Sequence, residues 1–359
     1  MGLLRFLLSA SVILAHSASF FGFSGMGSSA VPAFFIVSGF YMSLILSTKY
    51  LGPNRIWLFY SNRALRLYPV YFAVLAVFVA LSQLGVGAWP MSQISTAAAN
   101  PLRLAVDGTP PSLWAAIPNL TFVGADVIRV FVVDLETMHL QPWLTGIVEG
   151  PNYRGSYQYL VMPPIWSLGV EIVFYAMAPL LASLSNRQLF VLSLIALVVN
   201  LVMYYTLRGF LAWFHLLAPL NIIYFIIGML VHRSGSNLRS SNASKRGLLI
   251  SIPFILWACW QLLPSSPLLT WAAWFCFAAA LPSLFQATKN SRVDAALGAY
   301  SYPMYLCHTL FTWPMLSLGP WAGVAAIGLS AALSWLLISL IDRPIEAWRQ
   351  RRVKRLVPV

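Results

Sequence analysis

Charged residues are scarce in this sequence, since only 9% of its 359 residues are Asp, Glu, Lys or Arg. A soluble domain is nearer a quarter charged, so this composition excludes an ordinary soluble protein. Acidic residues are scarcest, with 9 against 22 Lys and Arg, which gives a net charge of +13. We attribute this surplus to membrane topology and to anionic lipid headgroups. We therefore expect membrane lipids, and no nucleic acid, among the partners of the protein.

Cysteine is equally sparse. The three cysteines form no CxxC pair and lie in apolar stretches, at Cys259, Cys276 and Cys307. This pattern does not provide a disulfide framework or a cysteine-rich metal site. We expect the three thiols to pack as small hydrophobic side chains, and we expect no metal.

Long apolar runs dominate what remains, because 59% of the residues are hydrophobic. Ten runs are long enough to span a bilayer: 3–22, 30–47, 67–86, 163–184, 189–207, 211–231, 247–264, 268–287, 297–317 and 321–341. Pro303 and Pro314 are expected to kink the ninth run. The sequence thus predicts an all-α polytopic membrane protein, with one bundle of about ten transmembrane helices in residues 1–345. A basic tail follows at 346–359.

The charges between these runs predict the orientation. With the N-terminus inside, eighteen Lys and Arg fall on the inner side and four on the outer side. Cytoplasmic loops carry such an excess, so we expect both termini in the cytoplasm. The first run, which continues through Ala15-His16-Ser17, also has features of a cleavable signal peptide. The pairing of Arg5 with His16 argues against a disposable segment.

One long segment, 88–162, is expected on the extracytoplasmic side. It is rich in proline and too polar to be a plain span, so we expect re-entrant or interfacial pieces within it. Its aromatic residues are Trp89, Trp114, Trp143, Tyr153, Tyr157 and Tyr159. They either anchor the protein at the membrane interface or form a platform on which sugar rings stack.

Ionisable residues inside the apolar runs are the candidate chemical groups. Arg5 and His16 are eleven residues apart, so they project from nearly one helix face about 16 Å apart along the axis. Glu171 and His308 are expected at a depth similar to that of His16. An ionisable residue at mid-membrane marks a polar pathway or site, and these three could form a buried acid–base site. Each histidine could instead make only an inter-helix hydrogen bond.

Two further motifs lie near these residues. Ser38-Gly39-Phe40 falls at mid-depth in the second run, where glycine permits close approach of a helix or a substrate. Arg63 and Arg66 open the third run on one face, a geometry suited to phosphates, although they could serve only as topological charge.

These motifs together resemble the acyltransferase family 3 integral membrane proteins. The matching segments are Arg5 with His16, FFIVSGF at 34–40, RALRLYP at 63–69, IWSLGVE at 165–171, LGAYSYPMYLCH at 297–308 and IDRP at 341–344. The resemblance implies the same ten-span layout in a bacterial plasma membrane. It also implies transfer of an acyl group, usually acetyl, from cytoplasmic acyl-coenzyme A to a hydroxyl of a glycan or glycolipid. Because the chain ends at Val359, we expect the form without an SGNH hydrolase-like domain.

The resemblance also implies roles for individual residues. The catalytic set is His16, Glu171 and His308, with His16 as general base or acyl carrier. The residues for acyl-coenzyme A are Arg5, Arg63 and Arg66, and those for substrate or packing are Ser38, Gly39, Phe40, Trp166, Ser167 and Tyr305. A transporter with a proton relay, or a non-catalytic partner in polysaccharide export, is the alternative. The sequence leaves the oligomeric state open.

Overall fold

The computed structural model describes residues 1–17, 26–50, 55–83, 110–137, 139–144, 152–207, 211, 213–235, 267–312 and 314–356. They divide into two units, which we describe separately. The first unit comprises Met1–Val74, Ala178–Ser193 and Tyr224–Val359, and the second comprises Leu75–Met177 and Leu194–Ile223.

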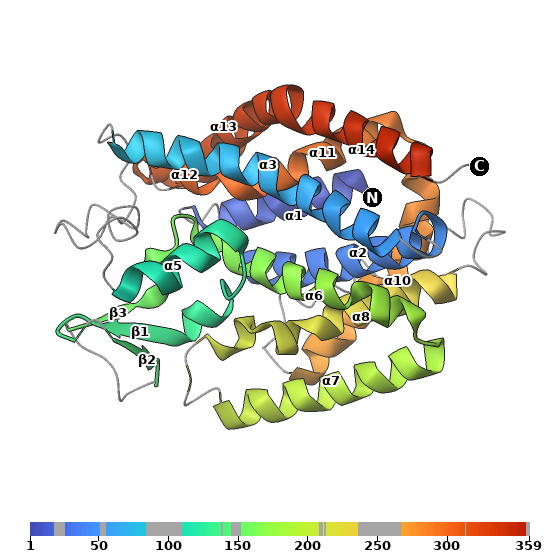
Figure 1. The fold of residues 1–359 in the computed structure, drawn as a ribbon, viewed down its shortest axis with the longest axis horizontal. Coiled ribbons are helices and arrows are strands. Elements are labelled where there is room, and N and C mark those ends of the chain that lie inside the picture. The colour runs from blue at the N-terminus through green and yellow to red at the C-terminus, as the bar shows by residue number, and fades with distance from the viewer. Residues whose placement is uncertain are drawn as a thin grey trace. The chain divides into compact units, whose positions relative to one another are not determined.

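The first unit is helical throughout its described part (Figure 1). It contains all of α1 (Gly2–Ala15), α2 (Met26–Thr48), α10 (Pro267–Thr288), α11 (Arg292–Cys307), α12 (Thr309–Thr312), η9 (Pro314–Trp321), α13 (Ala322–Leu337), the π-helical η10 (Ile338–Asp342) and α14 (Arg343–Leu356). It also contains parts of α3 (Arg55–Gln83), α6 (Trp166–Ser183), α7 (Asn186–Leu207) and α8 (Ala218–Ser234). Helix α1 packs against α2, α11 and α13.

Helices α1 and α11 begin in close contact because both carry glycine there. A Cβ atom on Gly2 would lie 1.7 Å from the Asp294 carbonyl oxygen, and one on Gly298 would lie 2.9 Å from the Gly2 Cα. The Asp294 carboxylate accepts hydrogen bonds from the backbone N–H groups of Gly2 (2.6 Å) and Leu3 (2.9 Å). These N–H groups have no partner within α1, so Asp294 caps that helix from its neighbour. The contact fixes the register of the two helices.

A second close crossing joins α2 to α8. A Cβ atom on Gly39 would lie 2.0 Å from the Phe225 carbonyl oxygen, and one on Gly228 would lie 2.0 Å from the Ile36 carbonyl oxygen. Only glycine leaves room for two backbones at this separation. Gly39 therefore serves the approach of a helix, which is one of the two possibilities that its sequence position left open.

The second unit carries the only strands among the described residues. These are β1 (Phe131–Asp134), β2 (Leu140–Pro142) and β3 (Tyr153–Gly155), which form an antiparallel sheet in the order β2-β1-β3. Val133 of β1 packs with Ala115 of α5 (Pro110–Thr121) and with Tyr159 of the 3-10 turn η5 (Ser156–Tyr159). The other 3-10 turns of this unit are η4 (Val127–Val130), η6 (Pro163–Ile165) and η7 (Phe214–Leu216). This sheet was not predicted from the sequence.

Six helical stretches are long and apolar enough to cross a membrane: Ser29–Thr48, Arg55–Leu81, Pro163–Ser183, Asn186–Leu207, Leu269–Thr288 and Pro314–Lys354. Two shorter apolar helices are α1 and α8. The predicted run 247–264 lies outside the described residues, as do residues 88–109 of the predicted extracytoplasmic segment. The predicted run 297–317 is not one continuous helix, since α11 ends at Cys307 and α12 begins after His308. The count of ten spans and the orientation stay predictions.

Candidate active site

Two histidines meet where α1 and α11 end. His16 follows the last residue of α1, and His308 follows the last residue of α11. Because the two helices also meet at Gly2 and Gly298, they run side by side in the same direction, and α1 measures about 21 Å. Nε2 of His308 lies 3.2 Å from Nδ1 of His16, and the ring centroids are 5.1 Å apart. The structure thus brings together two of the three predicted catalytic residues.

Backbone carbonyls determine which nitrogen of each neutral ring carries the proton. Nδ1 of His308 lies 2.7 Å from the Tyr305 carbonyl oxygen, which can only accept a hydrogen bond, so Nδ1 is protonated and Nε2 holds the lone pair. Nδ1 of His16 lies 3.0 Å from the Val12 carbonyl oxygen and also faces the Nε2 lone pair of His308. Nδ1 of His16 is therefore the protonated nitrogen, and its Nε2 is the basic one.

The two histidines differ in accessibility. His308 is completely buried, whereas His16 is exposed. The Tyr305 ring packs 5.8 Å from the His308 ring and 6.3 Å from the Phe34 ring, which places Tyr305 in the wall behind the pair. Two helix C-termini converge on the pair, and their partial negative charge favours a positive charge on the exposed imidazole. This arrangement suits a base with a positioning partner behind it.

The predicted donor-site arginines lie in a charged cluster of the first unit. Nη1 of Arg66 contacts both carboxylate oxygens of Asp342, at 3.0 and 3.2 Å. The Arg63 guanidinium lies 5.9 Å from the centre of the Phe59 ring. The positive charges of Arg63 and Arg66 both lie close enough to repel that of Arg349 of α14. Arg5 lies in another part of this unit. It is close enough to Tyr41 of α2 to interact electrostatically with the Tyr41 hydroxyl, as Asp294 also does.

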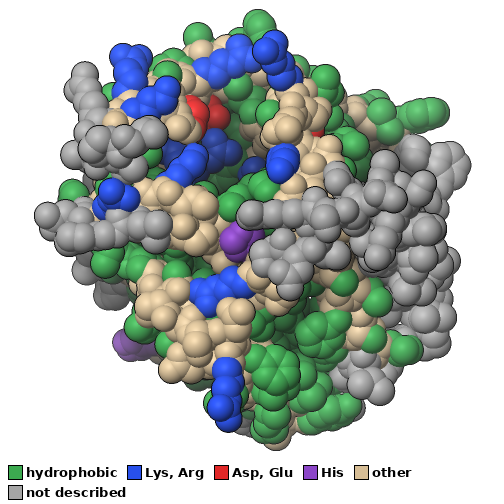
Figure 2. Space-filling model, turned by 90° about the vertical axis from the view of Figure 1, so that its right-hand side faces the viewer, with side chains coloured by type: hydrophobic (Ala, Val, Ile, Leu, Met, Phe, Trp, Pro, Cys, Tyr) green, Lys and Arg blue, Asp and Glu red, His purple; other side chains and the backbone are tan. Residues whose placement is uncertain are grey.

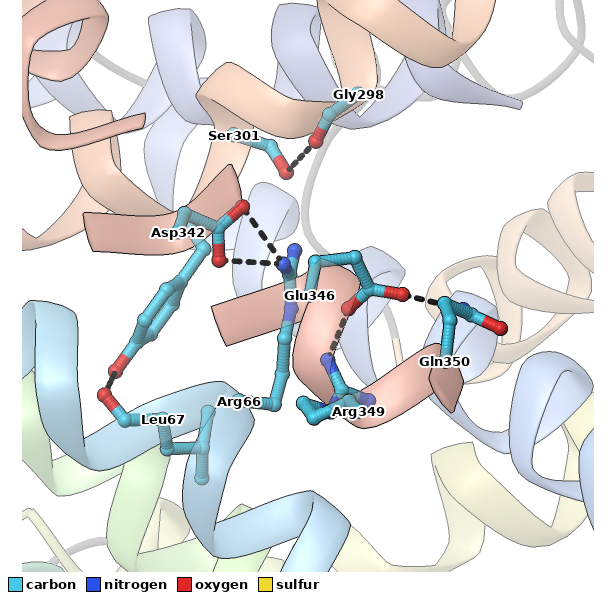
Figure 3. A network of polar contacts seen from close by, with 9 residues as sticks. Arg66, Leu67, Gly298, Ser301, Asp342, Glu346, Arg349 and Gln350 are labelled. Atoms are coloured by element: carbon cyan, nitrogen blue, oxygen red, sulfur yellow. Dashed lines mark hydrogen bonds and ion pairs between the residues drawn. The ribbon is translucent and has the colours of Figure 1, made fainter. Parts of the chain in front are cut away.

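Lys and Arg side chains gather around a hollow on one face of the protein, with acidic side chains at its edge (Figure 2). Figure 3 shows the Arg66 side chain reaching Asp342, and Arg349 reaching Glu346 on the same helix. The part that Asp342, Glu346 and Arg349 take in these ion pairs was not predicted from the sequence. IDRP at 341–344 was the only signal that could have indicated Asp342.

The SGF motif of α2 serves helix packing. Gly39 abuts α8, and Phe40 is buried against the rings of His232 (5.1 Å) and Phe285 (5.5 Å). Ser38 is half-buried.

The remaining predicted residues belong to the second unit. Glu171 accepts a hydrogen bond from the Tyr175 hydroxyl, one turn further along α6. Ser167 is buried and donates to the Pro164 carbonyl oxygen at 3.1 Å, and Trp166 is half-buried. Glu171 lies in the second unit and His16 in the first, so their expected proximity stays a prediction.

The second unit also contains an aromatic cluster around a cation. The Arg129 guanidinium lies 5.1 Å from the centre of the Tyr157 ring and 5.3 Å from that of the Trp213 ring. Trp143 packs beside both rings, at 6.3 Å from Tyr157 and 6.5 Å from Trp213. Trp213 is 40% exposed and has a left-handed backbone, with φ of 59°. The sequence had indicated Trp143 and Tyr157 but not Trp213, because nothing links position 213 to segment 88–162 along the chain.

Cys276 and Cys307 are both free thiols, and Cys307 is buried as expected. In the part of the chain that the structure describes, no three His, Cys, Asp or Glu side chains are arranged to hold a metal ion. The first unit thus contains a histidine pair at the ends of two apolar helices and a separate cluster of arginines and carboxylates around Arg66 and Asp342.

Comparison with known proteins identifies the family. The family model described as an acyltransferase domain, that of acyltransferase family 3, matches residues 1–339. The chain therefore belongs to this family, and the resemblance noted from its motifs is confirmed. No curated protein and no solved structure matches the chain. Together with the apolar helices, the family makes this protein a membrane acyltransferase.

Proposed function

We propose that the protein transfers an acetyl group from cytoplasmic acetyl-coenzyme A to a hydroxyl of a glycan or glycolipid on the other side of a bacterial plasma membrane. The observation that carries this proposal is the hydrogen-bonded pair of His16 and His308. Its tautomers leave the basic nitrogen on the exposed ring, where an acceptor hydroxyl can be deprotonated.

The transfer then runs in two steps. The acceptor hydroxyl gives its proton to Nε2 of His16, and its oxygen attacks the thioester carbonyl carbon. The C–S bond breaks as the carbonyl reforms, and the imidazolium returns the proton to the departing thiolate. Nε2 of His308 accepts a hydrogen bond from the Nδ1–H of His16 in both steps. This bond holds the His16 ring in place and stabilises the imidazolium. A path through an acetyl-imidazole on His16 would use the same nitrogen.

The donor end of the proposal rests on Arg63 and Arg66. Coenzyme A carries a phosphate monoester and a diphosphate, and guanidinium groups bind both well because their planar fork matches the phosphate oxygens. Arg5 is retained as a third candidate, since its side chain lies on the helix that ends at His16.

The acceptor end rests on the aromatic cluster of Trp143, Tyr157 and Trp213. Trp213 is exposed, whereas Trp143 and Tyr157 are half-buried. Aromatic rings present flat apolar faces together with polar edges, which suits the C–H face and the hydroxyls of a sugar ring. The positive charge of Arg129 beneath two of these rings favours an acceptor with anionic substituents. Glu171 is proposed to orient the reacting groups from the second unit.

Mass spectrometry of cell-surface glycans tests this function. A strain that lacks the gene is complemented with wild-type protein, with His16→Ala, or with Ser11→Ala as a matched control. Ser11 lies on α1, and its hydroxyl donates to the Leu7 carbonyl oxygen within its own helix. Acetyl groups are expected with wild type and Ser11→Ala and absent with His16→Ala. Full acetylation by a stably expressed His16→Ala would overturn the role of His16. Unchanged acetylation of the glycans on deletion of the gene would overturn the proposed function.

Cysteine labelling tests the sidedness on which the proposal depends. A cysteine at Ser112 should react with a membrane-impermeant reagent in intact cells, and a cysteine at Ser241 should react only after lysis. The reverse pattern would put Arg63 and Arg66 on the wrong side for cytosolic coenzyme A.

A further inference from the structure

Helix α14 lies beyond residue 339, where the family match ends, yet it completes the arginine cluster that begins on α3. Its position against α3 is fixed by Arg352. Nη2 of Arg352 donates to the Ser61 hydroxyl at 2.8 Å, and Nη1 donates to the Asn62 side-chain oxygen at 3.2 Å. The Arg352 guanidinium also stacks 5.1 Å from the centre of the Trp348 ring. These contacts place Arg349 beside the two arginines of α3.

Arg349 is the most unusual member of the cluster, because it is only 8% exposed. Its Nη1 pairs with Glu346, whose side chain is itself 37% exposed. Among the described residues, its Nε is buried without a hydrogen-bond partner. A guanidinium has five N–H donors, and one that is removed from water is costly unless anionic acceptors satisfy it. The single carboxylate of Glu346 leaves donors of Arg349 for another anion.

The charges around Arg349 do not balance. Arg63, Arg66, Arg349 and Arg352 contribute four positive charges, whereas Asp342 and Glu346 contribute two negative ones. The positive charges of Arg63 and Arg66 lie near both Arg349 and Glu346, so these three arginines share one electrostatic environment. The cluster belongs to the same charged region that Figure 3 shows in detail. A surplus of positive charge, including a buried guanidinium, fits a ligand that carries several phosphate groups.

We propose that Arg349 and Arg352 of α14, together with Arg63 and Arg66 of α3, form the surface that binds the phosphates of acyl-coenzyme A, with Glu346 occupying Arg349 until the donor arrives. This inference rests on the proposed function, because it assumes that coenzyme A is the donor. A phospholipid headgroup offers the same phosphate chemistry. Its single phosphodiester is held at the bilayer surface, whereas coenzyme A presents three phosphorus centres that four arginines can engage together.

Binding of coenzyme A to the purified full-length protein, measured by isothermal titration calorimetry, tests the inference. Arg349→Ala should weaken binding by about 10- to 100-fold, because a charge-assisted contact is lost. Glu346→Gln should bind about threefold more tightly, because it removes an anion that competes with phosphate. The matched control is Arg351→Ala, whose residue is exposed on the same helix and should bind like wild type.

Two further arms identify what Arg349 recognises. Acetyl-pantetheine lacks all three phosphates, so its KM should be the same for wild type and Arg349→Ala. Arg349→Lys keeps the charge and loses the planar fork, so it should bind coenzyme A with an affinity between those of wild type and Arg349→Ala. The lysine variant also replaces the alanine variant in this test if the latter does not fold.

Three results separate the ways in which this reasoning could fail. Wild type that does not bind coenzyme A overturns the proposed function itself. Wild type that binds, with Arg349→Ala and Arg349→Lys binding equally well, overturns the assignment of α14 alone. A lipid site is the better account if Arg349→Ala binds coenzyme A normally but loses stabilisation by vesicles of phosphatidylglycerol relative to phosphatidylcholine.

Discussion

Replacing His308 by phenylalanine isolates what the second histidine contributes to catalysis. The variant keeps a buried planar ring at a completely buried position, and it removes the Nε2 lone pair that lies 3.2 Å from Nδ1 of His16. In the transition state, His16 is positively charged and donates to that lone pair. A hydrogen bond to a charged group is worth about 1.5–3 kcal/mol. We therefore expect kcat to fall by a factor of about 10 to 150, with little change in the KM for acetyl-coenzyme A.

The assay is turnover of acetyl-coenzyme A in membrane vesicles that carry the glycan acceptor. His308→Gln should retain part of the activity, because its amide oxygen can still accept from His16. Thr312→Val serves as a control on the next helical turn, since the Thr312 hydroxyl is buried and no described residue is its hydrogen-bond partner. A folded His308→Phe with wild-type kcat would refute the role of His308 as positioning partner, even if His16 is essential.

Three further predictions follow from packing, burial and ring contacts. Gly228→Ala should destabilise the protein in detergent by about 1–3 kcal/mol, because the added Cβ would meet the backbone of α2. Gly328→Ala on α13 is the control. Its Cβ meets nothing within 4 Å, so it should stabilise the protein by about 0.5–1 kcal/mol. Burial raises the pKa of the Asp126 carboxyl, which accepts a hydrogen bond from the Ala218 N–H, so the protein should lose stability as pH rises above about 4. In thermal melts, the Tm of Asp126→Asn should equal that of wild type at pH 4 and exceed it at neutral pH. Trp213→Ala should raise the KM for the glycan and leave the KM for acetyl-coenzyme A unchanged. If Trp213→Ala has the wild-type KM for each substrate, the ring serves only as a membrane-interface anchor.

Much of the histidine pair could be predicted from the sequence. The depth of His16 and His308 in two apolar runs indicated a shared site, and the structure places their nitrogens within hydrogen-bond distance. The contact that sets the register was not predictable. It depends on Gly2 meeting Asp294, and apolar periodicity along one helix carries no information about which residue of another helix it meets.

Elsewhere the sequence revealed residue types but not partners. Arg66 was expected to face phosphates, and in the structure it pairs with Asp342, which is 276 positions away along the chain. The sheet around β1 was missed because its strands are only three or four residues long and lie among prolines, so the alternation that marks a strand has no room to appear. The catalytic role expected for Glu171 stays a prediction, because Glu171 lies in the second unit and His16 in the first.

Transfer of radiolabelled acetyl from acetyl-coenzyme A to glycan by the purified protein in lipid vesicles tests the central claim most directly. The account predicts label in the glycan for wild type and Ser11→Ala, and none above background for His16→Ala of equal abundance and thermal stability. Equal labelling by His16→Ala would contradict it, because the exposed ring at the end of α1 would then have no part in the chemistry.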